Sequence, residues 1–179
     1  MPFIFSIFNQ CLPGKTAPKE DEEISPRSRD DHGNTPLHLA AMKGLRAAAL
    51  LEIENGADID ATNKHGDTPL HLAARARRGK IASLLVRTGG ARTDISNNDG
   101  DTPLHLVAAT GQVGVAVLLL AEEDEDRYGV ARTNNRGDTP LHVAARTVQD
   151  HMYMFLLSRG GRWDVRNGDG ETPRSLYGF

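Results

Sequence analysis

A threonine–proline pair recurs five times along the chain at nearly constant spacing. Successive threonines stand 33, 34, 37 and 33 residues apart. A glycine lies two residues before each threonine, and Asp or Asn lies five residues before it. Leu-His follows the pair in four of the five copies. Because these columns share one register, they indicate a stack of structural repeats. The threonines are Thr35, Thr68, Thr102, Thr139 and Thr172.

Local chemistry predicts the shape of each unit. A threonine can cap a helix by accepting a first-turn N–H group, and proline is favoured directly after it. The pair therefore predicts a short helix, for example over about 36–43, in which small alanines let neighbouring helices approach closely. A break follows, marked by Gly44 and Gly111 in two units, and a second, more apolar helix then ends near a glycine such as Gly56. An extended segment and a turn rich in Asn, Asp and Gly complete a unit of helix, turn, helix and projecting finger.

Two segments, Thr35–Ala41 and Thr68–Ala74, both read Thr-Pro-Leu-His-Leu-Ala-Ala. With these, and with Gly56-Ala57-Asp58, the chain resembles the ankyrin-repeat family over about residues 30–179. The resemblance implies an all-α solenoid of helix-turn-helix units with β-hairpin-like fingers. The expected divisions are a flexible N-terminal tail at 1–29, four full repeats at 30–62, 63–96, 97–133 and 134–166, and a truncated C-terminal capping repeat at 167–179.

Two units are longer than the others. The second unit has one extra residue, which lies either at 77–79 or at 89–90. The third has four extra residues, which coincide with the acidic run 122–126. Acidic side chains at the C-terminal end of a helix oppose its dipole, so we expect a solvated loop there.

The first 29 residues differ from the rest in composition. They hold four of the nine prolines, the apolar cluster Phe3–Phe8 and the single cysteine, Cys11. The charged, proline-containing stretch from Lys15 to Ser28 predicts a disordered linker. Cys11 is expected to be a free thiol, and lipidation that holds the tail at a membrane is the alternative. Since one cysteine allows no disulfide framework, the chain is expected to be intracellular, in the cytoplasm, the nucleus or both.

The histidines predict structure rather than catalysis. Four of the seven fall in one repeat column: His38, His71, His105 and His142. Packed helices stand about 8–10 Å apart, whereas the ligand nitrogens of one zinc ion lie about 2.0–2.1 Å from it. These side chains cannot converge on a metal, and we expect each to hydrogen-bond between neighbouring repeats. No nucleophile–base set stands out, so we expect a non-enzymatic chain with no catalytic residue, cofactor, metal or small-molecule substrate.

Charge is nearly balanced, with 21 Lys and Arg against 24 Asp and Glu and a formal net charge of −3. This balance excludes an overall basic protein that coats nucleic acid. Nucleic-acid binding through the basic stretch 75–92 remains a less favoured hypothesis. That stretch contains Arg75, Arg77, Arg78, Lys80, Arg87 and Arg92, with no acid.

In the family that the chain resembles, partners usually contact the finger tips and the exposed side of the first helices. On the fingers, the resemblance marks Asp31, His32, Asn34, Lys64, His65, Asp67, Asn98, Asp99, Asp101, Asn135, Arg136 and Asp138. On the first helices it marks Met42, Lys43, Arg75, Ala76, Ala109, Thr110, Arg146 and Thr147. Arg75 and Arg146 are the preferred anchors, because arginine is enriched at binding hot spots and pairs bidentately with carboxylates.

Two features of this surface have alternative interpretations. Trp163 takes the finger position that Ile59 holds in the first unit, and it either packs inward or serves in recognition. An acidic column precedes the helix caps and comprises either solvated acids that favour the helix dipole or an acidic edge that faces a basic partner. Its members are Asp67, Asp101, Asp138 and Glu171.

The sequence as a whole favours a protein–protein interaction module, an adaptor or scaffold that is monomeric on its own and binds a protein partner on its concave face and finger tips. The alternative is a regulatory or inhibitory subunit of a separate enzyme or transcription factor. The N-terminal tail is expected to add a second contact, either to a groove of the partner or to a membrane.

Overall fold

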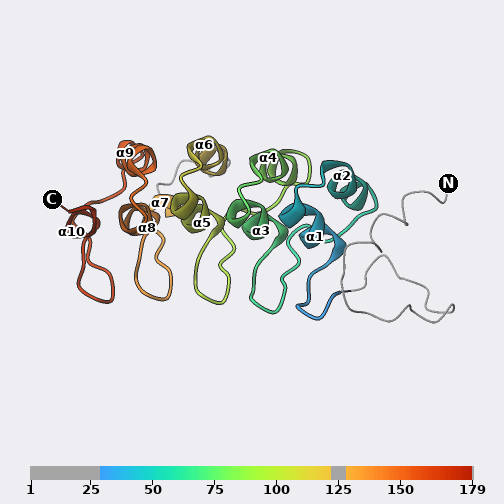
Figure 1. Ribbon diagram of the computed structural model, residues 1–179, viewed down its shortest axis with the longest axis horizontal. Coiled ribbons are helices and arrows are strands. Elements are labelled where there is room, and N and C mark those ends of the chain that lie inside the picture. The colour runs from blue at the N-terminus through green and yellow to red at the C-terminus, as the bar shows by residue number, and fades with distance from the viewer. Residues whose placement is uncertain (1–28, 122–127, 179) are drawn as a thin grey trace.

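The computed structural model describes residues 29–121 and 128–178, and within them it contains helices and turns but no strand. Figure 1 shows the helices in two rows, with loops projecting side by side from the inner row. The inner helices are α1 (Pro36–Lys43), α3 (Pro69–Arg75), α5 (Pro103–Thr110), α8 (Pro140–Arg146) and α10 (Pro173–Tyr177). The outer helices are α2 (Arg46–Glu54), α4 (Gly79–Arg87), α6 (Val113–Ala121) and α9 (Asp150–Ser158), and the short α7 (Tyr128–Ala131) precedes the fourth finger. The all-α solenoid that the sequence predicts is confirmed.

The inner helices begin where the threonine–proline pairs predict. The Thr35 hydroxyl accepts the His38 N–H, and His38 Nδ1 accepts the Thr35 N–H at 3.1 Å. This reciprocal pair is a capping box in which histidine takes the place that Glu or Gln usually holds. Helix α1 spans Pro36–Lys43, as predicted.

The break between the two helices of each unit uses a left-handed backbone position. Glycine fills it in the first and third units, with φ of 79° at Gly44 and 69° at Gly111. In the second and fourth units the same place holds Arg77 at 57° and Val148 at 54°. The sequence therefore marks the break with glycine only in the first and third units.

The extra residue of the second unit lies at the second of its two expected places. Helix α4 begins and ends at the same distance from its capping threonine as α2 does, so the added residue follows α4 and precedes Gly90. The acidic run 122–126, the apolar cluster Phe3–Phe8 and Cys11 lie outside the described residues. Arg29, which the sequence analysis assigned to the tail, donates to the carbonyl groups of Gly33 and Thr62 and so belongs to the first finger.

The core lies between the rows and is continuous from unit to unit. At the C-terminal end, Tyr177 of α10 stacks on Tyr153 of α9 with ring centroids 4.3 Å apart. At the N-terminal end, Leu45, which precedes α2, is 41% exposed, and Leu51 of α2 is 40% exposed. In the described part of the chain, no helix combines the length and the apolar character needed to cross a membrane.

Candidate functional site

The fingers are joined to one another by backbone hydrogen bonds near their tips. The Lys64 N–H donates to the His32 carbonyl, and the Asn98 N–H donates to the His65 carbonyl, both at 3.0 Å. The same bond recurs between the next fingers, from Asn135 to Asp99 and from Gly168 to Arg136. These bonds hold a row of turns in fixed register, so their exposed side chains form one preorganised surface.

Burial separates the predicted contact residues into three groups. Asn34, Asp67 and Asp138 are buried, and their selection as surface contacts is corrected by this burial. Asp101, Ala76, Ala109 and Thr110 are partly exposed. The exposed members are Asp31, His32, Met42, Lys43, Lys64, His65, Arg75, Asn98, Asp99, Asn135, Arg136, Arg146, Thr147 and Trp163.

The repeated histidines join each unit to the next. His38 Nδ1 accepts a backbone N–H, so its proton lies on Nε2, which donates to the Asp67 carbonyl at 2.9 Å. His71 and His105 donate in the same way to the carbonyls of the following units, and His142 lies within bonding distance of two. Burial is the largest cause that lowers the pKa of all four histidines, which keeps their rings neutral. The predicted hydrogen bonding between neighbouring repeats is confirmed.

A second ladder of hydrogen bonds contacts the two acids of the column that are buried. The Asn97 side chain donates from Nδ2 to Asp67 Oδ1 at 2.8 Å, and Asn167 donates to Asp138 Oδ1 at 2.7 Å. Asp67 is 0% exposed and Asp138 is 1% exposed, so the interpretation of these two as solvated acids is wrong. A carboxylate loses hydration on burial, and hydrogen bonds from the next unit replace part of it.

The two preferred anchors pair with these same acids. Arg75 donates two hydrogen bonds to Asp67, with Nη1 2.7 Å from Oδ2 and Nη2 3.1 Å from Oδ1. Arg146 binds Asp138 in the same bidentate way, at 2.6 and 3.2 Å, and also contacts Glu171 at 3.0 Å. The spacing of eight residues, repeated in two units, was the signal in the sequence for these pairs.

The pairing also determines how Asp138 titrates. Burial by itself would raise the pKa of this carboxyl, but hydrogen bonds from Asn167 and Arg146 and the positive charge of Arg146 outweigh burial, so its pKa lies below the ordinary value. Both arginines therefore have an internal structural role, whatever else they contact.

Trp163 lies in the last finger with 49% of its surface exposed. The Arg174 guanidinium of α10 lies 5.3 Å from the centre of its ring, a distance at which cation–π attraction operates. The indole is thus supported on one side and open to solvent, so it does not pack fully inward, and its role in recognition stays a prediction.

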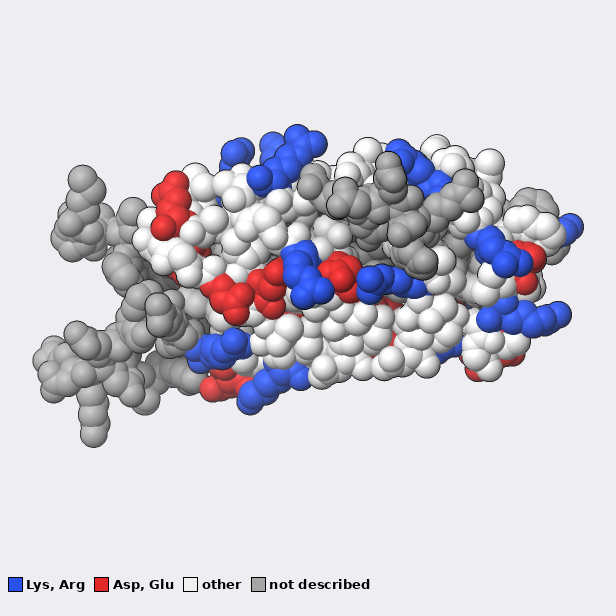
Figure 2. Space-filling model, turned by 180° about the vertical axis from the view of Figure 1, so that it is seen from behind, with Lys and Arg blue, Asp and Glu red and all other residues white. Residues whose placement is uncertain are grey.

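The basic stretch 75–92 does not form an unbroken positive surface. Arg75 is paired with Asp67, and Arg92 is paired with Asp94, which also contacts Arg132. On the face of the molecule that Figure 2 presents, seen from behind, acidic and basic side chains lie side by side in a row. Alternating charges of this kind do not favour binding to a phosphate backbone.

The described residues contain no group of three or more His, Cys, Asp or Glu side chains that could hold a metal ion. Among these residues, every buried side-chain nitrogen or oxygen has a hydrogen-bond partner. The arrangement is therefore a set of satisfied internal ladders beneath an exposed row of side chains.

Comparison with known proteins identifies one family. The family model described as "Ankyrin repeats (3 copies)" matches residues 10–97 and again residues 81–167. No curated protein matches the chain.

Proposed function

Because the chain belongs to the ankyrin-repeat family, we propose that it is an adaptor or scaffold that binds a protein partner through its finger tips and inner helices. Repeats of this family are generally protein–protein interaction modules and typically non-enzymatic. The observation that supports the proposal best is the row of finger tips joined by backbone hydrogen bonds. A surface ordered before binding loses little conformational entropy when the partner docks.

We propose further that the chain acts without catalysis of its own and functions inside the cell. The single cysteine supports a reducing compartment. The ladders of neutral histidine, asparagine and paired acid support a structural use of the polar side chains that catalysis would otherwise employ.

The test uses charge changes that leave the internal pairs intact. Arg75→Glu or Arg146→Glu would place a second carboxylate beside a buried one and destabilise the fold. Lys64→Glu with Arg136→Glu instead alters two exposed finger tips, whose backbone bonds remain. The matched control, Lys80→Glu with Arg46→Glu, makes the same charge change at exposed positions in the first turns of outer helices.

Affinity capture from the native cell extract, with quantitative mass spectrometry, compares the three proteins. We expect the finger variant to lose its main protein partner by about tenfold or more and the outer-helix control to retain it. Equal capture by all three proteins would place the binding surface elsewhere and contradict the proposal.

A further inference from the structure

Resting on the protein-binding function proposed above, we infer that Asp101 accepts an arginine side chain of the partner protein, at the junction of the third finger with α5. The molecule itself contains two examples of the contact. In the second and fourth units, an arginine at the end of the inner helix reaches back to the acid that precedes the cap. Both contacts are bidentate, as planar guanidinium and carboxylate groups prefer.

The third unit holds the same acid in the same frame but lacks the arginine. Asp101 N–H donates to Asn97 Oδ1 at 3.0 Å, as Asp67 N–H donates to Asn63 Oδ1 at 3.0 Å. Its Oδ1 accepts from Asn134 Nδ2 at 2.7 Å, which matches the bonds that the two buried acids receive. The residue eight positions later is Ala109, where the other two units have arginine.

The Asp101 carboxylate can therefore accept further hydrogen bonds. Within residues 29–121 and 128–178, no lysine or arginine forms an ion pair with Asp101. Its two counterparts each accept two hydrogen bonds from an arginine, and this acid stays partly exposed where they are buried. Ala109 carries no polar group that could pair with Asp101, and it is itself partly exposed.

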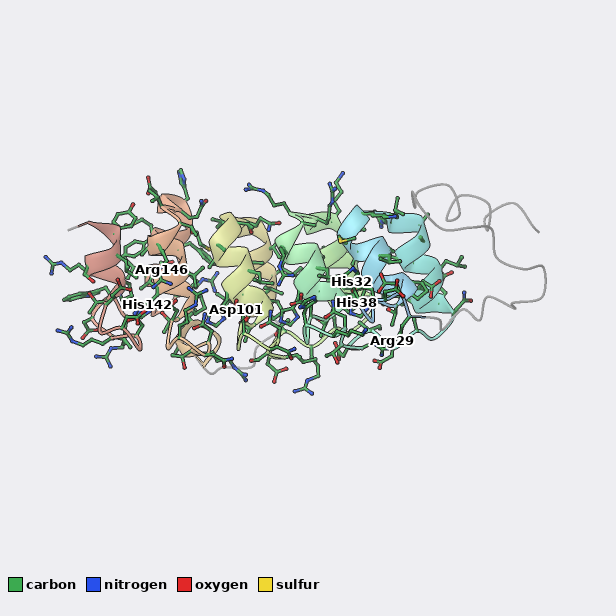
Figure 3. All side chains as sticks on the ribbon, turned by 60° about the horizontal axis from the view of Figure 1, so that its bottom comes forward. Arg29, His32, His38, Asp101, His142 and Arg146 are labelled. Atoms are coloured by element: carbon green, nitrogen blue, oxygen red, sulfur yellow. The ribbon has the colours of Figure 1, made fainter. Side chains whose placement is uncertain are left out.

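Charge along the row supports a cationic occupant. The acidic column contributes four carboxylates, whereas Arg75 and Arg146 contribute two guanidinium groups. Figure 3 shows Asp101 in one row between Arg146 and His38, where the inner helices meet the fingers. Arginine fits better than lysine, because the two internal pairs use both terminal nitrogens of a planar fork.

The test selects ligands from a library of random peptides displayed on phage, with the full chain as target. Each selected peptide is then measured by fluorescence polarisation, both as selected and with its arginine replaced by citrulline, which is neutral and of similar shape. We expect a loss of about tenfold or more on that replacement and a similar loss for Asp101→Asn. The citrulline peptide should bind the Asp101→Asn variant no more weakly than either change alone would give, because both changes remove the same contact.

Two further variants complete the design. Ala109→Arg supplies the missing arginine from within the chain, so it should lower peptide affinity to the same extent while the melting temperature does not fall. Glu54→Gln removes one negative charge from an exposed position of α2, and it should leave peptide affinity unchanged. Helical circular dichroism verifies that each variant is folded.

Peptides that bind with equal affinity to the chain and to Asp101→Asn, yet lose affinity on Lys64→Glu with Arg136→Glu, would overturn this inference and leave the proposed function standing. A selection that yields no ligand for the fingers or inner helices would overturn both.

Discussion

Two residues occupy a backbone conformation that their side chains disfavour. Arg77 and Val148 have φ of 57° and 54°, at the break that Gly44 and Gly111 fill in the other units. The left-handed region is rare for residues other than glycine and is an outlier for a β-branched side chain. Val148 is also 73% exposed, so packing of its side chain does little to offset the strain. The fourth unit therefore keeps its helix-to-helix turn at a cost in stability.

Replacing Val148 by glycine should stabilise the protein. We expect the free energy of unfolding to rise by about 1 kcal/mol, because glycine adopts this conformation without strain. Urea unfolding followed by circular dichroism measures the change. Val148→Ala is the matched control, since it removes the exposed side chain but keeps a Cβ, and it should recover less than half of the gain. An equal gain from alanine would mean that the exposed valine side chain, rather than the backbone, is the source of the instability.

The sequence predicts those backbone conformations that a residue and its immediate neighbours determine. The left-handed turns at Gly44 and Gly111 follow from glycine itself, and α1 begins at Pro36 because Thr35 caps it. Valine itself does not indicate a left-handed conformation, so the conformation of Val148 can be inferred only from its position in the repeat register.

Neighbouring units contact one another through the inner helices and the fingers. Each of the four full-length inner helices places one buried histidine against a carbonyl of the next unit. Burial lowers the pKa of each ring, so protonation would require either a buried charge or the loss of the hydrogen-bond acceptor at Nδ1. Low pH should therefore destabilise all four junctions between units.

Stability should fall as the pH drops below about 6.5, the ordinary pKa of histidine. Below that pH, histidines of the unfolded chain bind protons that the folded chain does not bind. The contribution of the histidines to the free energy of unfolding is therefore fully present above about pH 6.5 and declines as the pH falls toward their lowered pKa values in the folded state. The decline is at most about 1.4 kcal/mol per histidine for each pH unit. Urea unfolding at pH 7.5, 6.5 and 5.5 measures it, in a range above that in which the Asp138 carboxyl, with its lowered pKa, titrates.

The comparison variant for this prediction is His71→Gln, which removes one of the four groups. It should be less stable than the parent at pH 7.5 and lose less stability between pH 7.5 and 5.5. An identical pH dependence in both proteins would show that the histidine column does not control acid sensitivity.

The helices of each unit were predictable because their caps and breaks are local, whereas the burial of the acids was not. Asp67 becomes inaccessible because Asn97 arrives from the next unit and Arg75 folds back from the end of α3. Neither neighbour can be read from the residues beside Asp67. The finger tips are exposed, as the sequence predicts, whereas the acids beneath them are buried, and contact of a partner with the tips stays a prediction.

Helix α10 covers the C-terminal end of the described array. Helix α10 packs against α8 and supplies Tyr177, which stacks on Tyr153 and whose hydroxyl lies 2.6 Å from a carboxylate oxygen of Asp150. In a stack, each unit contacts only its neighbours, and stability is a sum of unit and junction contributions. Loss of one end should therefore affect the nearest unit most.

A chain that ends at Glu171, and so lacks α10, should open first at its new end. We expect hydrogen exchange of the α9 amides to accelerate by about tenfold or more, since Tyr153 loses the stacked ring of Tyr177, while the α3 amides change little. Exchange measured by NMR or mass spectrometry compares the two helices in both proteins. Equal acceleration in α3 and α9 would show that the array unfolds as one unit.

The asparagine ladder also bears on how such a chain can change length. Asn63 donates from Nδ2 to Asn34 Oδ1, and Asn97 donates to Asp67 Oδ1, each at 2.8 Å. If residues 63–96 were deleted, Asn97 would meet Asn34, an acceptor that already serves an asparagine. A duplication of the same segment would place the second copy of Asn63 against the first copy of Asp67, an acceptor that already serves an asparagine. Units can thus be gained or lost in a gene without the invention of a new junction.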